Sequence, residues 1–161
     1  MPIDLHMEAV PQDMPFPPER RGGANPENLK ANIAAFERLL AHNRDARIVW
    51  LHAGWDLTGL RTTGLMEDLL RRHPNLAMNI KADRIGTPAS GPFGPDGKIK
   101  PAWLAMLQAF PDRFAIGSDE FAGDGVDRFT NARRLIDQLP SDLTRRVGHE
   151  NARRLYRLPP R

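Results

Sequence analysis

Cysteine is absent from this chain of 161 residues. Without a thiol, the protein has no disulfide framework, no cysteine nucleophile and no thiolate metal site. Any bound metal must therefore be held by His, Asp or Glu side chains together with water.

Long hydrophobic runs and blocks of like charge are also missing. No stretch is long and apolar enough to span a membrane, and no signal peptide is recognisable, so we expect a soluble, cytoplasmic protein with no membrane partner. The formal net charge is only +3. The arginines are scattered over expected helices close to acidic residues, which is typical of solvated helix faces. No basic patch is interleaved with aromatic residues, so we expect no nucleic-acid partner.

The composition that remains is that of one globular domain over residues 1–161, with 40% hydrophobic and 27% charged residues. Segments of strand type and helix type alternate along it. The expected strands are 3–8, 48–52, 76–81 and 114–118, and the expected helices are 26–42, 65–73, 101–110, 126–139 and 141–156. Four successive βα units predict parallel strands joined by helical crossovers, an α/β fold.

Three long loops rich in proline or glycine connect these elements, at residues 11–26, 54–64 and 86–100. A structureless stretch as long as 86–100 inside a domain is typical of a lid or a binding loop. We expect these loops to shape any substrate pocket.

Three polar residues end apolar strand-like runs: His6, His52 and Asp119. The carboxyl ends of parallel strands are where α/β proteins bind ligands, and two imidazoles with one carboxylate suit a divalent metal. The alternatives are a satisfied core histidine for either His, and a helix cap or turn former for Asp119. An ionised carboxylate buried after a strand is costly unless it is paired or binds a cation, which favours the metal hypothesis.

Side-chain alternation separates the faces of these strands. In the first strand, His6 and Glu8 share the polar face, which would point into a barrel interior. In the fourth, Asp119 has the parity of Ala115 and Gly117. We expect these small residues to leave room for something bulky beside the acid.

The order of four motifs resembles the amidohydrolase superfamily, most closely its branch of metal-dependent hydrolases and decarboxylases. The motifs are His6-Met7-Glu8, Leu51-His52-Ala53-Gly54, Ile116-Gly117-Ser118-Asp119 and the tail Gly148-His149-Glu150-Asn151-Ala152-Arg153-Arg154-Leu155. The resemblance covers nearly the whole chain but corresponds only to the C-terminal half of that family's (β/α)8 TIM barrel. It therefore implies a half-barrel, with part of the fold missing.

The resemblance also implies roles for the three residues. His6 matches a metal ligand on the fifth barrel strand, and His52 matches the sixth-strand histidine, which binds metal or orients the water. Asp119 matches the eighth-strand aspartate, which contacts the metal and transfers a proton. The implied cofactor is a divalent metal, zinc first, with manganese, iron or nickel as alternatives. The implied reaction on a small-molecule substrate is hydrolysis of a C–N or C–O bond by metal-activated water, with decarboxylation as the alternative.

One family feature is absent: no two of the five histidines stand two positions apart, so there is no counterpart of the first-strand His-x-His pair. The chain is then expected to supply half a site. The other half would come from the rest of a longer gene product, from a second copy of the chain or from a separate N-terminal half. The alternative is a non-catalytic fragment that binds a partner.

Four further residues are weaker candidates. Glu8 would support a ligand histidine, Lys81 and Arg84 would bind a substrate carboxylate, and Trp55 would wall the pocket. Each has a surface or core-packing role as its alternative. His149 belongs to the tail motif, in which the resemblance implies that Asn151 anchors the last helix, and His42 and His73 end helices, so none of these histidines is expected to bind metal.

Overall fold

The computed structural model describes most of the chain from residue 29 onward. The described residues are 3–5, 29–53, 55–56, 59–82, 84–86, 90–120 and 127–159. The candidate residues His6 and Glu8 and the loop 11–26 therefore lie outside the described residues.

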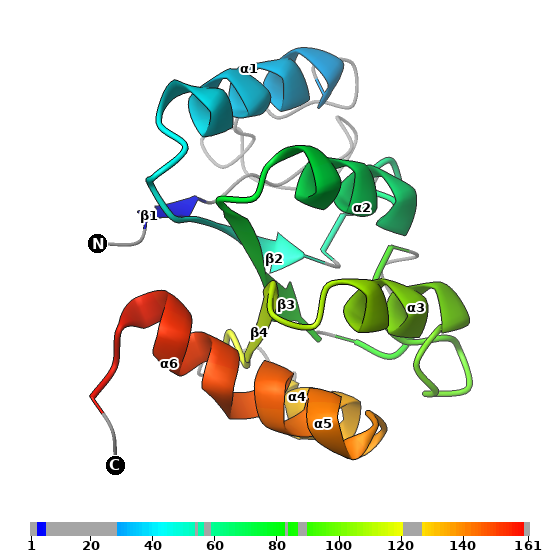
Figure 1. The fold of residues 1–161 in the computed structure, drawn as a ribbon. Helices are drawn as coiled ribbons and strands as arrows, with labels where there is room; N and C mark the ends of the chain where they lie inside the picture. Colours follow the sequence, from blue (N-terminus) through cyan, green and yellow to red (C-terminus); the bar gives the residue numbers. More distant parts are fainter. Residues whose placement is uncertain are drawn as a thin grey trace.

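The described elements alternate as the sequence predicts (Figure 1). They are β1 (Ile3–Leu5), α1 (Leu29–His42), β2 (Ile48–Ala53), α2 (Thr63–Arg72), β3 (Leu76–Lys81), α3 (Pro101–Ala109), β4 (Phe114–Gly117), α4 (Arg128–Asp137), α5 (Ser141–Arg145), the π-helical turn η3 (Arg146–Glu150) and α6 (Asn151–Tyr156). The four strands form one sheet in the order β1-β2-β3-β4, and every pair is parallel. The α/β class and the parallel sheet are confirmed, whereas the half-barrel stays a prediction.

The last helix differs from the continuous helix expected over 141–156. It is divided into α5 and α6 by the π-helical turn η3, which contains Gly148. A Cβ at Gly148 would lie 3.3 Å from Ile136 Cδ1, so the glycine permits close approach to α4. No helix within the described residues is long and apolar enough to cross a membrane.

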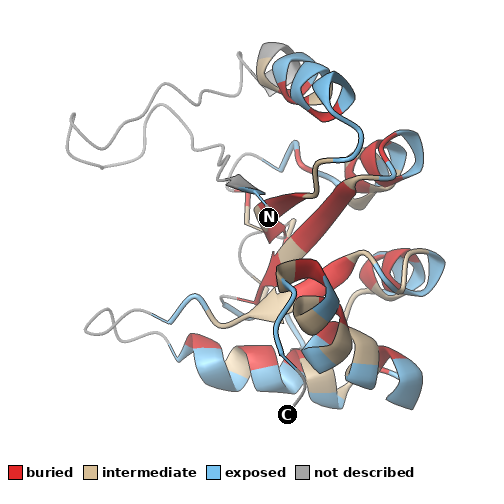
Figure 2. Ribbon diagram, turned by 60° about the vertical axis from the view of Figure 1, so that its left-hand side comes forward, coloured by how far each residue is buried: buried red, intermediate tan, exposed pale blue. Residues whose placement is uncertain are grey.

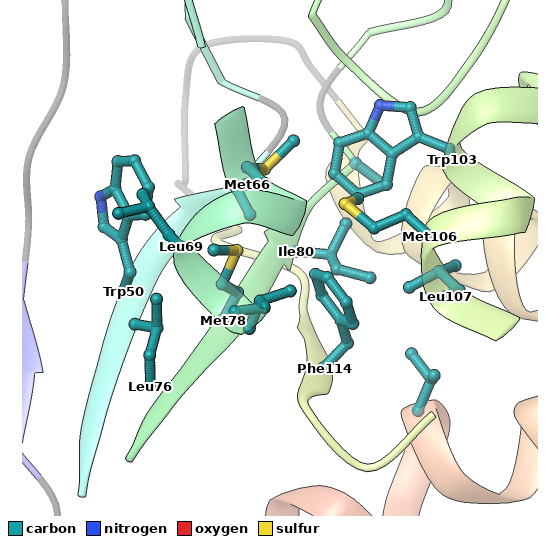
Figure 3. Packing of buried hydrophobic residues seen from close by; sticks show 14 of the residues in the cluster. Trp50, Met66, Leu69, Leu76, Met78, Ile80, Trp103, Met106, Leu107 and Phe114 are labelled. Carbon is teal, nitrogen blue, oxygen red and sulfur yellow. The ribbon is translucent and has the colours of Figure 1, made fainter. Parts of the chain in front are cut away.

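One face of the sheet carries most of the core, which we call the outer core. The helices α1, α2 and α3 lie together on this side, and the sheet is buried while the far sides of the helices are exposed (Figures 1 and 2). The close-up in Figure 3 shows strand residues meeting helix residues at its centre. The residues labelled there are Trp50, Met66, Leu69, Leu76, Met78, Ile80, Trp103, Met106, Leu107 and Phe114.

The opposite face of the sheet is covered at one end by α6. Leu155 packs there against Val49, Ala77 and Ala115, and all four are buried. The side-chain amide of Asn151 donates to two carbonyl oxygens, that of Pro111 in the turn before β4 and that of Phe114 at the start of β4, each at 2.7 Å. This contact anchors α6 against the sheet, as the tail motif predicts, and leaves the carboxyl ends of the strands to form the site.

Candidate functional site

A bulge in β2 decides where His52 points. Trp50 pairs with Met78, but the next registered pair is Ala53 with Ile80, so β2 carries one extra residue. His52 lies within this irregularity with φ of +60°, in the left-handed region. Alternation alone would place His52 on the face of Trp50; instead, Ala53 is buried in the outer core, and His52 turns to the opposite face.

Asp119 meets His52 from the end of β4. It follows the strand by two residues, with φ of +50°. Its Oδ1 lies 3.4 Å from His52 Nε2, and its Oδ2 lies 2.7 Å from Lys81 Nζ. Left-handed backbone at two residues with a Cβ is uncommon, and such conformations gather at functional sites. We call these three residues the His–Asp–Lys cluster.

Lys81 and Trp55 complete the arrangement. The side chain of Lys81 is only 8% exposed, and its Nζ lies 4.3 Å from the centroid of the half-buried Trp55 ring. The indole thus stacks on the cation that pairs with Asp119. The sequence predicts that Lys81 binds a substrate carboxylate. In the structure, Lys81 contacts the carboxylate of Asp119.

The electrostatic surroundings keep Asp119 ionised. Burial alone would raise the pKa of its carboxyl group. The hydrogen bond and charge of Lys81, with the charges of His52 and Arg128, outweigh burial, so the pKa lies below its ordinary value. At neutral pH the cluster therefore presents a carboxylate base beside an imidazole.

The space expected beside Asp119 is partly filled. Gly117 lies against Asn79, and a Cβ there would come within 3.0 Å of the Asn79 side-chain nitrogen. The small residue therefore accommodates a side chain of this protein, since Asn79 of β3 points to the same face.

The other candidate residues and the remaining histidines lie outside the His–Asp–Lys cluster or outside the described residues. Arg84 is exposed and makes none of the contacts of the cluster described above. His6 and Glu8 are not among the described residues, so their proposed roles stay predictions. His149 is exposed, while His73 is buried and contacts Glu37 on α1 at 3.0 Å.

Sequence reasoning did not single out three buried polar residues near this site: Asp56, Arg61 and Arg128. Asp56 and Arg61 belong to the loop after β2, and Arg128 begins α4. The available signal was the position of Arg61 in the loop 54–64, which follows the candidate ligand His52. Its burial was not visible, because loop arginines are usually exposed.

Among the described residues, no group of three His, Cys, Asp or Glu side chains is placed to hold a metal ion. Two donors do converge, because His52 Nε2 and Asp119 Oδ1 are 3.4 Å apart. Neighbouring ligands of tetrahedral zinc at the usual bond lengths are separated by about 3.3 Å. The two atoms are therefore close enough to bind one metal ion together, and such an ion would need further ligands.

Comparison with known proteins gives one result. Neither the curated proteins nor the solved structures include a significant match. A family model described as Amidohydrolase matches residues 2–158, nearly the whole chain. The chain therefore belongs to the amidohydrolase family.

Proposed function

We propose that this chain supplies part of the active site of a metal-dependent hydrolase of the amidohydrolase type. The observation that carries the proposal is the convergence of His52 Nε2 and Asp119 Oδ1 at 3.4 Å, with Lys81 holding the other carboxylate oxygen. Family membership supports a hydrolase-type or related function.

The chain's own residues have distinct parts in this chemistry. Asp119 is the general base: its lowered pKa keeps it ionised, and its carboxylate would accept a proton from the attacking water and pass it to the leaving group. Lys81 fixes Oδ2 at 2.7 Å and so orients the carboxylate. His52, together with Asp119 and His6, would hold the metal, and the imidazole would stabilise developing negative charge.

The cofactor proposed is a divalent metal, zinc first, with manganese, iron or nickel as alternatives. When bound, such an ion lowers the pKa of a coordinated water to about 7. Trp55, Lys81 and Arg84 are proposed to contact a small-molecule substrate, with Glu8 supporting His6. The same set of residues would also serve a decarboxylase relative of this family.

The partner is proposed from the incompleteness of the site. The four sequentially ordered parallel strands are the arrangement that half of an eight-stranded barrel would need. A second copy of this chain or a separate N-terminal half would supply the remaining strands and ligands. Unpaired sheet edges favour such association.

A second candidate is a non-catalytic domain that binds a partner and no metal. It is favoured by the Lys81–Asp119 ion pair, which neutralises the carboxylate within the chain itself.

The test is the metal content of the purified chain after incubation with Zn²⁺ and gel filtration. The first candidate predicts near-stoichiometric zinc that falls sharply in Asp119→Ala. The matched control is Asp45→Ala, at an exposed position on the turn after α1, which should retain it. The elution volume reports self-association in the same run. A folded sample without zinc would reject the enzyme proposal and favour the second candidate.

A further inference from the structure

The loop after β2 folds back beneath His52 and carries a buried cation. Arg61 has 0% of its surface exposed. Its guanidinium carbon lies 4.4 Å from the centroid of the Trp50 ring. Nη1 donates a hydrogen bond to the carbonyl oxygen of His52 at 3.2 Å. Burial of a guanidinium is costly unless its donors form hydrogen bonds, and this contact satisfies one of them.

The carbonyl of His52 has a second donor. The backbone N–H of Trp55 also donates to it, at 2.9 Å. His52 itself has φ of +60°, which is unfavourable for a residue with a Cβ. Two donors on one carbonyl fix the peptide that follows the bulge and hold the backbone in this conformation. The direction of the imidazole depends on that backbone, since the bulge is what turns it toward Asp119.

Arg61 is held in turn by a chain of hydrogen bonds that reaches α3. Its backbone N–H donates to Oδ2 of Asp56, which is fully buried, at 2.5 Å. The carbonyl oxygen of Asp56 accepts from Ser90 Oγ at 3.0 Å. The indole of Trp103 on α3 donates to the Ser90 carbonyl oxygen at 2.9 Å. These contacts tie the loop to the rigid outer core.

We propose that Arg61 is the positioning residue for His52. It stacks on Trp50 and bonds the His52 carbonyl, and it thereby aims the imidazole at Asp119. The part of this inference that concerns metal binding rests on the proposed function. The other part, that Arg61 fixes the orientation of His52, does not depend on any metal.

The first measurement is zinc affinity, by titration against a chromogenic chelator. The variant is Arg61→Met, which keeps an unbranched apolar stem beside Trp50 and removes the donors. The control for general destabilisation is Leu69→Ala, a fully buried outer-core position on α2 that makes none of these hydrogen bonds. Melting temperatures are measured for both, so that each is assayed well below its own transition. We expect about a 10- to 100-fold weaker affinity in Arg61→Met, the range for residues that orient a metal ligand.

Arg61→Lys separates charge from geometry. Lysine keeps the charge but lacks the planar fork that stacks and donates in fixed directions, so we expect it to weaken zinc binding as well. Unchanged affinity in Arg61→Met, or an equal loss in Leu69→Ala, would overturn the proposal.

The second measurement needs no metal. In protein labelled with ¹⁵N at histidine, the His52 imidazole should give one sharp set of signals in the wild type and in Leu69→Ala. In Arg61→Met, the signals should broaden or double. If the wild type binds no zinc, the proposed function fails, and these spectra still decide the role of Arg61. An unaltered His52 signal in Arg61→Met would refute it.

Discussion

Replacing Lys81 with methionine tests whether the ion pair of the cluster stabilises the fold. Methionine keeps an unbranched stem and removes the ammonium group that contacts Asp119 at 2.7 Å and the Trp55 ring at 4.3 Å. A hydrogen bond to a charged group contributes about 1.5–3 kcal/mol. The Asp119 side chain is 40% exposed, so solvent screening reduces this to about 1 kcal/mol. The cation–π contact adds about 0.5–1 kcal/mol, and we expect a total loss of about 1–2 kcal/mol at pH 7.

The pH dependence of that loss has a definite sign. Because the pKa of Asp119 is lowered in the folded state, its contribution to stability is present above the unfolded pKa near 3.9 and is lost as pH falls through the folded pKa. The difference between wild type and Lys81→Met should therefore be constant from pH 7 to 5 and shrink below pH 4. The part that comes from the Trp55 contact should remain, because the indole ring does not titrate in this range.

Urea unfolding followed by tryptophan fluorescence at pH 7, 5 and 3.5 measures these values. Lys98→Met, at an exposed lysine, is the control and should change stability little at any pH. A loss that is the same at all three pH values would refute the reasoning, because it would show that the carboxylate of Asp119 contributes nothing through Lys81. No loss at pH 7 would refute it as well.

Three further predictions concern backbone conformation, pH and the anchor of α6. Since Asp119 has φ of +50°, Asp119→Gly should be more stable than Asp119→Ala by about 1 kcal/mol in thermal melts, and a more stable alanine variant would contradict this. Burial, reinforced by two nearby arginines, lowers the pKa of His73. Its stabilising contribution is therefore present above its unfolded pKa of about 6.5 and is lost as pH falls below that value. In His73→Gln, the free energy of unfolding should vary less between pH 7.5 and 5 than in the wild type, and an unchanged slope would count against this assignment. Asn151→Ala leaves the carbonyls of Pro111 and Phe114 without this donor and should cost about 1–3 kcal/mol in urea unfolding, whereas a neutral effect would mean that the anchor is not needed.

The local pattern of the chain was enough to predict the order of its elements. The strand-type segments 48–52, 76–81 and 114–118 are apolar and short, and the structure places β2, β3 and β4 there within one residue. The helical segments were recognisable by their apolar periodicity, which a helix must have to cover a sheet. The π-helical turn before Asn151 was not recognisable, because the local sequence carries no signal for it; in the structure this turn contains Gly148, which lies against Ile136 of α4.

The candidate site was predicted in part. Position after an apolar run marked His52 and Asp119, since polar residues at strand ends are few. The role of Lys81 was not evident, because its partner arrives from a strand 38 positions further along the chain. Arg61 and Asp56 were missed for a similar reason: loop residues of these types are usually exposed, and only the folded loop buries them.

The sequence by itself determined the alternation of strands and helices, the parallel sheet and the family, because hydrophobic periodicity and short motifs are local properties of the chain. Only the tertiary structure decided which face His52 occupies. Simple alternation along β2 would place its side chain on the same face as that of Trp50. The extra residue that moves it to the other face becomes apparent only from the pairing of β2 with β3. The same holds for the His–Asp–Lys cluster, because its residues come from β2, β3 and the segment after β4, and the distances between them exist only once the sheet has formed.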